Sequence, residues 1–425
     1  MILGRLFRML TASTAMSLAL IAAPAFAAAP ANDGVAPVAA PAAPDRERAR
    51  MNQRVFDRVW SEVRTQYYDP GLHGVDWNAA RRTWRPVALT APDDRTLYRV
   101  LGGMLDLLDD DHAGVSPPAV ARRQDTLRQR RAAIGVSLRP EPSGEAYLIE
   151  RVRPDSPAAE AGVAAGWRLI TGEGALWTPE QDIAEGRAVT LSLVDGEGAA
   201  RPLTLTPRMM EPTPPFVADR SRPGVLVLTV DGFEVGLGRW MGDQLANLSP
   251  ETDVVIDLRG NPGGRLVEAD AVLSCFLPHG RLWAARTGRS GRRVDLRTGG
   301  GCGDLDEPVE HDVAVLVDAN SRSAAELTPA ALQEAGRAVV VGAPTAGAVL
   351  ISQETNLPDG GRLSLSRADF VTAGGVRLEK RGVTPDVAAP LTPEDQRAGR
   401  DPGLDAALAA LRADPAMALL PAPAL

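Results

Sequence analysis

Apolar side chains recur every three to four positions in two stretches near the start of the chain, residues 55–63 and 97–108. This spacing places them along one face of a helix. Between the two stretches, Asp76 stands before WNAARRTW, where its carboxylate can accept backbone N–H groups of a first helical turn. Residues 48–130 are therefore predicted to form a helical N-terminal domain.

The pattern changes further along to an alternation of apolar and polar residues, at 134–138, 147–149 and 189–193. Alternation is typical of strands with one buried face, and the Gly, Pro and Asp residues between these stretches favour turns. Residues 131–207 are therefore predicted to form a small β-rich domain.

The third pattern is a series of almost wholly apolar runs that alternate with stretches of helical spacing. Such runs are typical of strands buried on both faces of a parallel or mixed sheet. The runs are Val225–Val230, Val254–Leu258, Val313–Val317 and Ala338–Val341, and the helical stretches lie near 236–248, 264–275 and 323–335. We predict an α/β core over residues 215–395, which includes a hairpin-like segment at 357–387, and a C-terminal helix and tail over 396–425.

The N-terminus has the organisation of an export signal. Arg5 and Arg8 precede an uncharged, Ala- and Leu-rich run that ends near Ala25-Phe26-Ala27, and an A-x-A pattern of this kind precedes cleavage. We therefore predict a signal peptide at 1–27 and an Ala/Pro-rich linker at 28–47. The mature protein is expected to be periplasmic or secreted, with no stable membrane insertion after cleavage.

Composition removes several classes of function. The formal net charge is −8 and no segment carries a run of basic residues, so no nucleic-acid partner is predicted. The four histidines lie far apart and the two cysteines form no CxxC pair, so we predict neither a metal site nor a cofactor. Cys275 and Cys302 form either a disulfide, which export permits, or a free pair. The chain contains a single lysine, Lys380.

A candidate nucleophile lies where a buried strand meets a helix, in the sequence VAVLVDANSRSAAEL. Ser323 falls at the start of the helix, where unpaired backbone N–H groups and the helix dipole favour a developing oxyanion. Ser323 and Glu326 also have the spacing of a capping box. Local sequence alone favours the capping role.

Four motifs taken together favour the role of Ser323 as a nucleophile over a purely capping role. They are DLRGNPGG at 257–264, NSRSAAE at 320–326, GRAVVVGAPTAG at 336–347 and RGVTPD at 381–386. In this order they resemble the C-terminal processing peptidases, also called tail-specific proteases, over nearly all of residues 48–390. The resemblance implies a crotonase-like core of ββα units, with Ser323 as the nucleophile.

A second resemblance concerns the β-rich domain. The sequence DSPAAEAGVAAGWRL at 155–169 resembles the PDZ pattern of bacterial proteases. In PDZ domains, a loop of backbone N–H groups receives the C-terminal carboxylate of a peptide, which adds a strand to the edge of the sheet. Ile134, Gly135 and Val136 occupy the position of that loop, so the resemblance implies that they bind substrate.

The family resemblance also indicates a base. The main branch uses a lysine 25 residues after the serine, where this chain has Ala348. A second branch, which resembles the core of tricorn protease, uses a histidine from a D-x-H motif and a glutamate just before the RGVTPD motif. The matching residues here are His112, in the sequence Asp110-Asp111-His112, and Glu379.

The chemistry implied by this second branch is that of a serine triad. The histidine takes the proton of the serine and passes it to the leaving amine, while Glu379 orients the ring. The implied oxyanion donors are the N–H groups of Ala324 and of Gly263 or Gly264. We therefore predict an exported serine endopeptidase that selects protein or peptide substrates through their C-terminus. The alternative is a non-catalytic periplasmic binding or scaffolding protein on the same fold, and no oligomeric state is predicted.

Overall fold

The structure is a computed structural model that describes residues 46–413, apart from 126–128, 142–143, 173–174, 180, 300, 393–394 and 396–399. The predicted signal peptide, nearly all of the predicted linker and the end of the tail lie outside the described residues.

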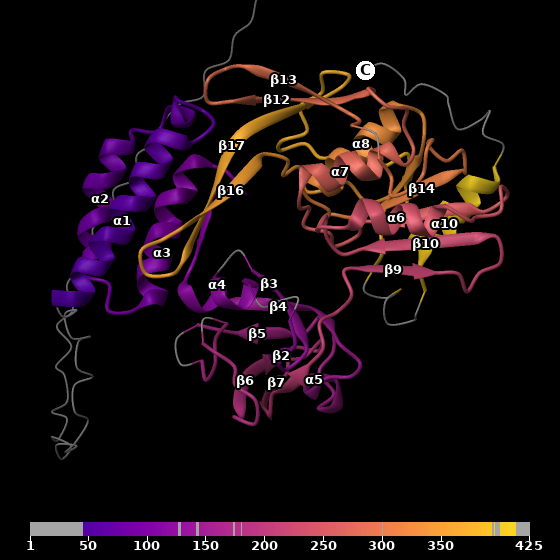
Figure 1. Cartoon of the computed structure of the whole chain (residues 1–425). Coiled ribbons are helices and arrows are strands. Elements are labelled where there is room, and N and C mark those ends of the chain that lie inside the picture. Colours follow the sequence, from indigo (N-terminus) through magenta and orange to yellow (C-terminus); the bar gives the residue numbers. More distant parts are fainter. Residues whose placement is uncertain are drawn as a thin grey trace, which may run out of the picture. The chain divides into compact units, whose positions relative to one another are not determined.

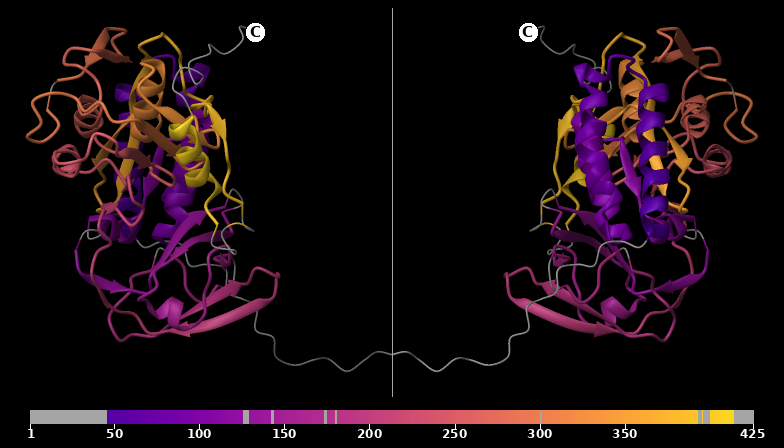
Figure 2. Two further views of the ribbon diagram at one scale, coloured as in Figure 1. Left: turned by 90° about the vertical axis from the view of Figure 1, so that its right-hand side faces the viewer. Right: turned by 90° about the vertical axis from the view of Figure 1, so that its left-hand side faces the viewer.

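Three helices that lie side by side form the N-terminal region (Figure 1, Figure 2). The apolar stripes seen in the sequence form their shared core, in which Phe56 and Leu101 are fully buried. Asp76 caps the second helix as predicted, because its Oδ1 accepts the Ala79 N–H at 2.9 Å. The elements are α1 (Arg46–Gln66), η1 (Leu72–Gly74), α2 (Trp77–Leu89), α3 (Asp94–Leu105), η2 (Asp106–Leu108) and α4 (Pro118–Asp125).

The β-rich region contains a five-stranded antiparallel sheet in the order β3-β4-β5-β6-β7, so β3 and β7 lie at its edges. A separate two-stranded ladder pairs the segments that enter and leave this region. The elements are β2 (Arg131–Ala133), β3 (Val136–Pro140), β4 (Ala146–Val152), α5 (Pro157–Glu160), β5 (Arg168–Ile170), β6 (Val189–Val194), β7 (Ala200–Leu205) and β8 (Arg208–Met210).

A six-stranded sheet in the order β18-β15-β14-β11-β10-β9 forms the core, and all its pairs are parallel except β9 with β10. Successive residues of one strand enter two different cores: Leu226 and Leu228 pack with α6, α7 and α8, whereas Val225 and Val227 pack with α10. Burial on both faces explains the unbroken apolar runs. The strands are β9 (Phe216–Asp219), β10 (Val225–Val230), β11 (Asp253–Asp257), β14 (Val313–Val317), β15 (Val339–Gly342) and β18 (Val387–Ala388), and the helices are α6 (Leu237–Leu245), α7 (Leu266–Ser274), α8 (Ala324–Glu334) and α10 (Pro402–Arg412).

A further five-stranded sheet contains a long hairpin that starts earlier than the predicted segment at 357–387. The hairpin consists of β16 (Ile351–Asn356) and β17 (Arg362–Thr372), and β17 also pairs with β1 (Gly114–Ser116) and with β12 (Leu282–Gly288), the partner of β13 (Arg293–Arg297). The first arm gave no hydrophobic signal because most of β16 is exposed. Leu363 and Leu365 of β17 are buried with the N-terminal helices.

These elements confirm the predicted α/β fold class with a helical N-terminal region. Cys275 and Cys302 form a disulfide, which decides between the two alternatives left open by the sequence. Within the part of the chain that the structure describes, no helix is both long and apolar enough to cross a membrane.

Candidate active site

Ser323 lies in the turn between β14 and α8. Asp318 fixes the first part of this turn, because its Oδ1 accepts the N–H groups of Asn320 and Ser321 at 2.9 and 3.0 Å. Ser323 has φ 54° and ψ −117°, a conformation that costs a non-glycine residue about 1–3 kcal/mol. In serine hydrolases, a strained strand-to-helix turn of this kind exposes the side chain of the nucleophile.

Glu326, which is fully buried, ties the Ser323 turn to the loop after β15. Its Oε2 accepts the N–H groups of Ser323 and Ala348 at 3.1 and 2.9 Å. Its Oε1 accepts the Thr345 hydroxyl at 2.5 Å and the Gly347 N–H at 2.7 Å. Burial raises the pKa of Glu326, and these hydrogen bonds oppose the rise. The glutamate of the predicted capping box therefore does more than cap α8: it joins two loops around the serine.

A second turn, after β11, approaches Ser323 closely. A Cβ added at Gly263 would lie 2.7 Å from the Ser323 Cβ, so this approach requires glycine. Asn261 is fully buried in the turn, where its Oδ1 accepts the Gly263 N–H and its Nδ2 donates to the last carbonyl of β10, both at 2.7 Å. Since the Gly263 N–H is occupied, Gly264 is the better of the two predicted alternatives for an oxyanion donor. Within the described residues, the N–H groups of Gly264 and Ala324 have no hydrogen-bond partner.

His112 follows η2 in a tight turn that Asp110 closes, with Oδ1 accepting the His112 N–H at 2.8 Å. The ring is half-buried, and its Nδ1 is buried with no hydrogen-bond partner among the described residues. Burial lowers the pKa of His112, the Asp110 carboxylate opposes this, and the charges of Arg322 and Lys380 add to the lowering. The histidine is therefore neutral at neutral pH, as a general base must be.

Glu379 is buried, and its two carboxylate oxygens have different surroundings. Oε2 accepts the Val349 N–H at 2.9 Å, whereas Oε1 is buried without a partner among the described residues. Burial raises the pKa of Glu379; the Val349 hydrogen bond opposes this rise, and the charge of Asp110 adds to it. One oxygen thus fixes the carboxylate and the other remains available.

The three predicted catalytic residues come from loops that converge. The charges acting on His112 include Arg322, which precedes Ser323, and Lys380, which follows Glu379. No hydrogen bond joins His112 to Ser323 or to Glu379 in the described part of the chain, and the buried His112 Nδ1 and Glu379 Oε1 both lack partners. Catalytic hydrogen bonds are often long in unliganded enzymes and shorten when substrate binds.

Lys380 has the environment of an ion-paired surface lysine. Its Nζ lies 3.0 Å from Asp111 Oδ2 and 3.4 Å from Asp109 Oδ1. Partial burial lowers the pKa of Lys380, but the two aspartates outweigh this effect and hold the pKa above its usual value. Position 348, where the main branch of the family has its lysine, is a buried alanine whose carbonyl accepts the Ser323 N–H at 2.8 Å. Neither position supplies a neutral amine next to the serine.

The sequence indicated no role for three residues that the structure places near the site: Tyr67, Asp110 and Arg322. Burial and the Asp110 carboxylate raise the pKa of Tyr67, whose side chain is fully buried. Asp110 could have been found, because an aspartate two residues before His112 is placed to cap its backbone N–H. Nothing in the local sequence marks Tyr67 or Arg322.

The predicted substrate loop lies at the start of β3, at a sheet edge. Gly135 has φ 83°, and a Cβ there would lie 2.1 Å from the Ser156 Cβ, so only glycine fits. The Ile134 carbonyl accepts the Ala158 N–H at 3.0 Å, which fastens the loop to α5. Val136 begins the edge strand.

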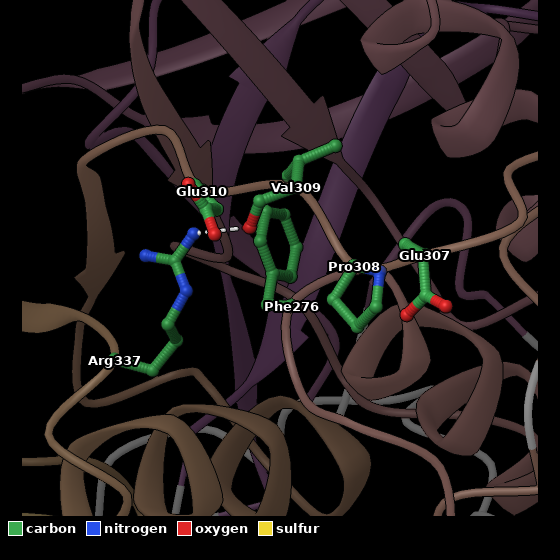
Figure 3. Close-up of a pocket in the computed structure, with 6 residues that line it drawn as sticks. All are labelled: Phe276, Glu307, Pro308, Val309, Glu310 and Arg337. Carbon is green, nitrogen blue, oxygen red and sulfur yellow. Dashed lines mark hydrogen bonds between the residues drawn. The ribbon is translucent and has the colours of Figure 1, made fainter.

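The cavity drawn in Figure 3 belongs to another part of the core. It is lined by Phe276, Glu307, Pro308, Val309, Glu310 and Arg337, none of which comes from the loops just described. Arg337 reaches across it and donates to the Val309 carbonyl at 2.7 Å. We assign no catalytic part to this cavity.

A serine in a strained turn at the end of a parallel sheet, beside turns with open N–H groups, is the arrangement of a serine hydrolase. Residues 224–389 match peptidase family S41, and residues 48–106 match the C1 domain of tricorn protease. The chain is a serine-type peptidase, and its core is similar to peptidase family S41 over residues 224–389.

Two relatives and one solved structure describe this similarity. The carboxy-terminal-processing protease of Bartonella bacilliformis is 28% identical over 356 residues, which are 78% of this chain and 74% of that protein. Tricorn protease homolog 1 of Streptomyces coelicolor is 27% identical over 408 residues, 85% of this chain and 35% of the homolog. The structure of the photosystem II D1 C-terminal processing protease is 22% identical and covers 87% of this chain and 99% of that chain, with a TM-score of 0.58. This last similarity shows the shared fold.

Proposed function

We propose that the chain is an exported serine endopeptidase with Ser323 as nucleophile, His112 as general base and Glu379 as the residue that orients the histidine. The observation that carries the proposal is the meeting of three loops. The loop of Ala348 and Val349 hydrogen-bonds to both Ser323 and Glu379, and Lys380, next to Glu379, pairs with Asp111, next to His112. The His112 ring lies within electrostatic reach of the residues next to Ser323 and Glu379, and both His112 and Glu379 keep a buried atom without a partner.

These atoms suit the steps of acyl transfer. A hydrogen bond from Nδ1 of His112 to Oε1 of Glu379 would hold the tautomer whose Nε2 accepts the Ser323 proton. The same imidazolium then protonates the leaving amine. The N–H groups of Gly264 and Ala324 are the donors for the oxyanion.

Two observations support export and recognition of a substrate's C-terminus. The Cys275–Cys302 disulfide fits an oxidising compartment, in agreement with the A-x-A pattern of the N-terminus. The edge strand β3 and the glycine turn at Gly135 fit a site where a peptide adds a strand and its terminal carboxylate meets backbone N–H groups.

The test is a kinetic comparison of four folded variants on one peptide substrate. Ser323→Ala and His112→Ala should each lower kcat/KM by several orders of magnitude, because the two residues act as a unit. Glu379→Gln should cost less, and Lys380→Ala, the control at an exposed ion pair, should stay near wild type. An inactive Lys380→Ala together with an active His112→Ala would overturn the histidine mechanism. A wild-type protein that binds peptides without cleaving them would support the binding-protein alternative.

A further inference from the structure

Arg322 is a cation next to the nucleophile that the catalytic proposal does not use. Its backbone is fixed on both sides, because its N–H donates to the Asn261 carbonyl at 2.9 Å and its carbonyl accepts the Ala325 N–H at 3.0 Å. Its side chain is half-buried. In the part of the chain that the structure describes, the Arg322 guanidinium has no hydrogen bond and no ion pair, and none of its nitrogens is buried without a partner. Its nitrogens are therefore accessible to solvent, and the described residues offer them no acceptor.

Three other cations on the loops of the site are paired. Arg377 pairs with Asp369 at 2.6 Å, and Arg259 lies 2.7 Å from Asp257. The lysine beside Glu379 pairs with two aspartates. Arg322 differs from these three because its charge has no partner in the described residues, and this charge also helps to lower the pKa of His112.

We propose that Arg322 is a specificity-determining residue that binds a carboxylate of the substrate beside the scissile bond. A planar guanidinium presents paired N–H groups that match the two oxygens of a carboxylate, and this contact is stronger than a neutral hydrogen bond. Because Arg322 adjoins Ser323 in the chain, the carboxylate belongs to a residue close to the cleaved bond. Two sources carry this chemistry: an Asp or Glu side chain, and the terminal α-carboxylate of a short substrate.

The inference rests on the proposed function, and it adds a consequence for the base. Burial is the main cause of the lowered pKa of His112, and a carboxylate that pairs with Arg322 cancels one of the charges that add to it. Acidic substrates should therefore make the bound enzyme's histidine a stronger base than it is in the free enzyme.

The test measures binding and cleavage separately. The probes are fluorescent peptides that carry Glu, Gln or Lys next to the scissile bond, each with a free or an amidated C-terminus. Their binding is measured by fluorescence anisotropy, with the Ser323→Ala protein and with the same protein that also carries Arg322→Gln. Cleavage is then measured with wild type, Arg322→Gln, Arg322→Lys and Arg322→Glu. The matched control is Arg99→Gln, because Arg99 is an exposed arginine of α3 with no side-chain partner in the described residues.

We expect the Glu peptide, or the free-acid form, to bind about tenfold more tightly than its neutral counterpart. Arg322→Gln should remove that ratio, Arg322→Lys should retain part of it, Arg322→Glu should favour the Lys peptide, and Arg99→Gln should change nothing. Loss of the Glu/Gln ratio identifies a side-chain carboxylate, and loss of only the acid/amide ratio identifies the terminal one.

Equal binding of all peptides to the Ser323→Ala protein would overturn the inference. So would an equal loss of kcat/KM on every peptide in Arg322→Gln, since that result would indicate a general contribution to catalysis. Failure of the proposed function would look different: the wild-type protein would cleave no peptide, while anisotropy would still report on Arg322.

Discussion

Replacing Glu326 by glutamine should destabilise the core and inactivate the nucleophile, although the two side chains have almost the same shape. The carboxylate of Glu326 accepts four hydrogen bonds with its two oxygens. The amide keeps one oxygen, which can serve Thr345 and Gly347. Its NH₂ group then faces the N–H groups of Ser323 and Ala348, which are donors as well.

The loss in the free energy of unfolding depends on whether the N–H groups of Ser323 and Ala348 find another acceptor. The Ser323 N–H keeps the Ala348 carbonyl at 2.8 Å, but the buried Ala348 N–H is left with no acceptor. An unsatisfied buried donor costs about 1–3 kcal/mol, and hydrogen bonds to a charged group contribute about 1.5–3 kcal/mol each, part of which is offset because no charge is buried. We expect Glu326→Gln to lose about 3 kcal/mol of the free energy of unfolding.

The assay is urea unfolding followed by tryptophan fluorescence, with Glu334→Gln as the matched control. Glu334 lies on the same helix but is exposed. Its carboxylate accepts the Thr372 hydroxyl and the Gly374 N–H, and a glutamine can keep one of these two bonds, so the substitution should cost about 1 kcal/mol. Below the transition, folded Glu326→Gln should also react much more slowly with a fluorophosphonate, since Ser323 is no longer held. A variant that unfolds at the wild-type urea concentration and reacts at the wild-type rate would refute the role given to this carboxylate.

Three further outcomes follow from the geometry. Because burial lowers the pKa of His112 and only the neutral ring acts as base, kcat/KM should be level near pH 7 and fall only below about pH 6.5; a fall that begins well above pH 7 would contradict a histidine base. Replacing Cys275 and Cys302 by serine opens a link with a sequence separation of 27 residues and should cost about 3.5 kcal/mol in urea unfolding, whereas two alkylated thiols in unreduced exported protein would exclude the disulfide. Amidating a substrate's C-terminus should slow its cleavage if the Gly135 loop receives the carboxylate, and equal rates for both forms would exclude that role.

The sequence predicted the elements of the core because their hydrophobic spacing is local. The apolar run at Val313–Val317 became a wholly buried strand, and the helix after Ser323 starts where the capping pattern places it. Strands and helices of this kind depend on residues within a few positions of one another, so a single sequence carries their signal.

The parts that were not predicted depend on contacts between distant residues. The exposed first arm of the β16–β17 hairpin has no apolar pattern, and its pairing is set by β17. The hydrogen bonds of Glu326 to Thr345 and Ala348 span 19 and 22 residues, and no local rule connects them. Likewise, the role proposed for Arg322 depends on the fold, which brings its charge near His112 and leaves its guanidinium without a partner in the described residues.

The most direct test of the catalytic proposal is to treat the mature protein with a fluorophosphonate probe and to map the labelled residue by mass spectrometry. We expect a single label on Ser323, lost after heat denaturation, greatly slowed in His112→Ala and unchanged in Lys380→Ala. A label on another residue, or labelling of Ser323 that is as fast in His112→Ala as in wild type, would contradict the assignment of the serine and its base.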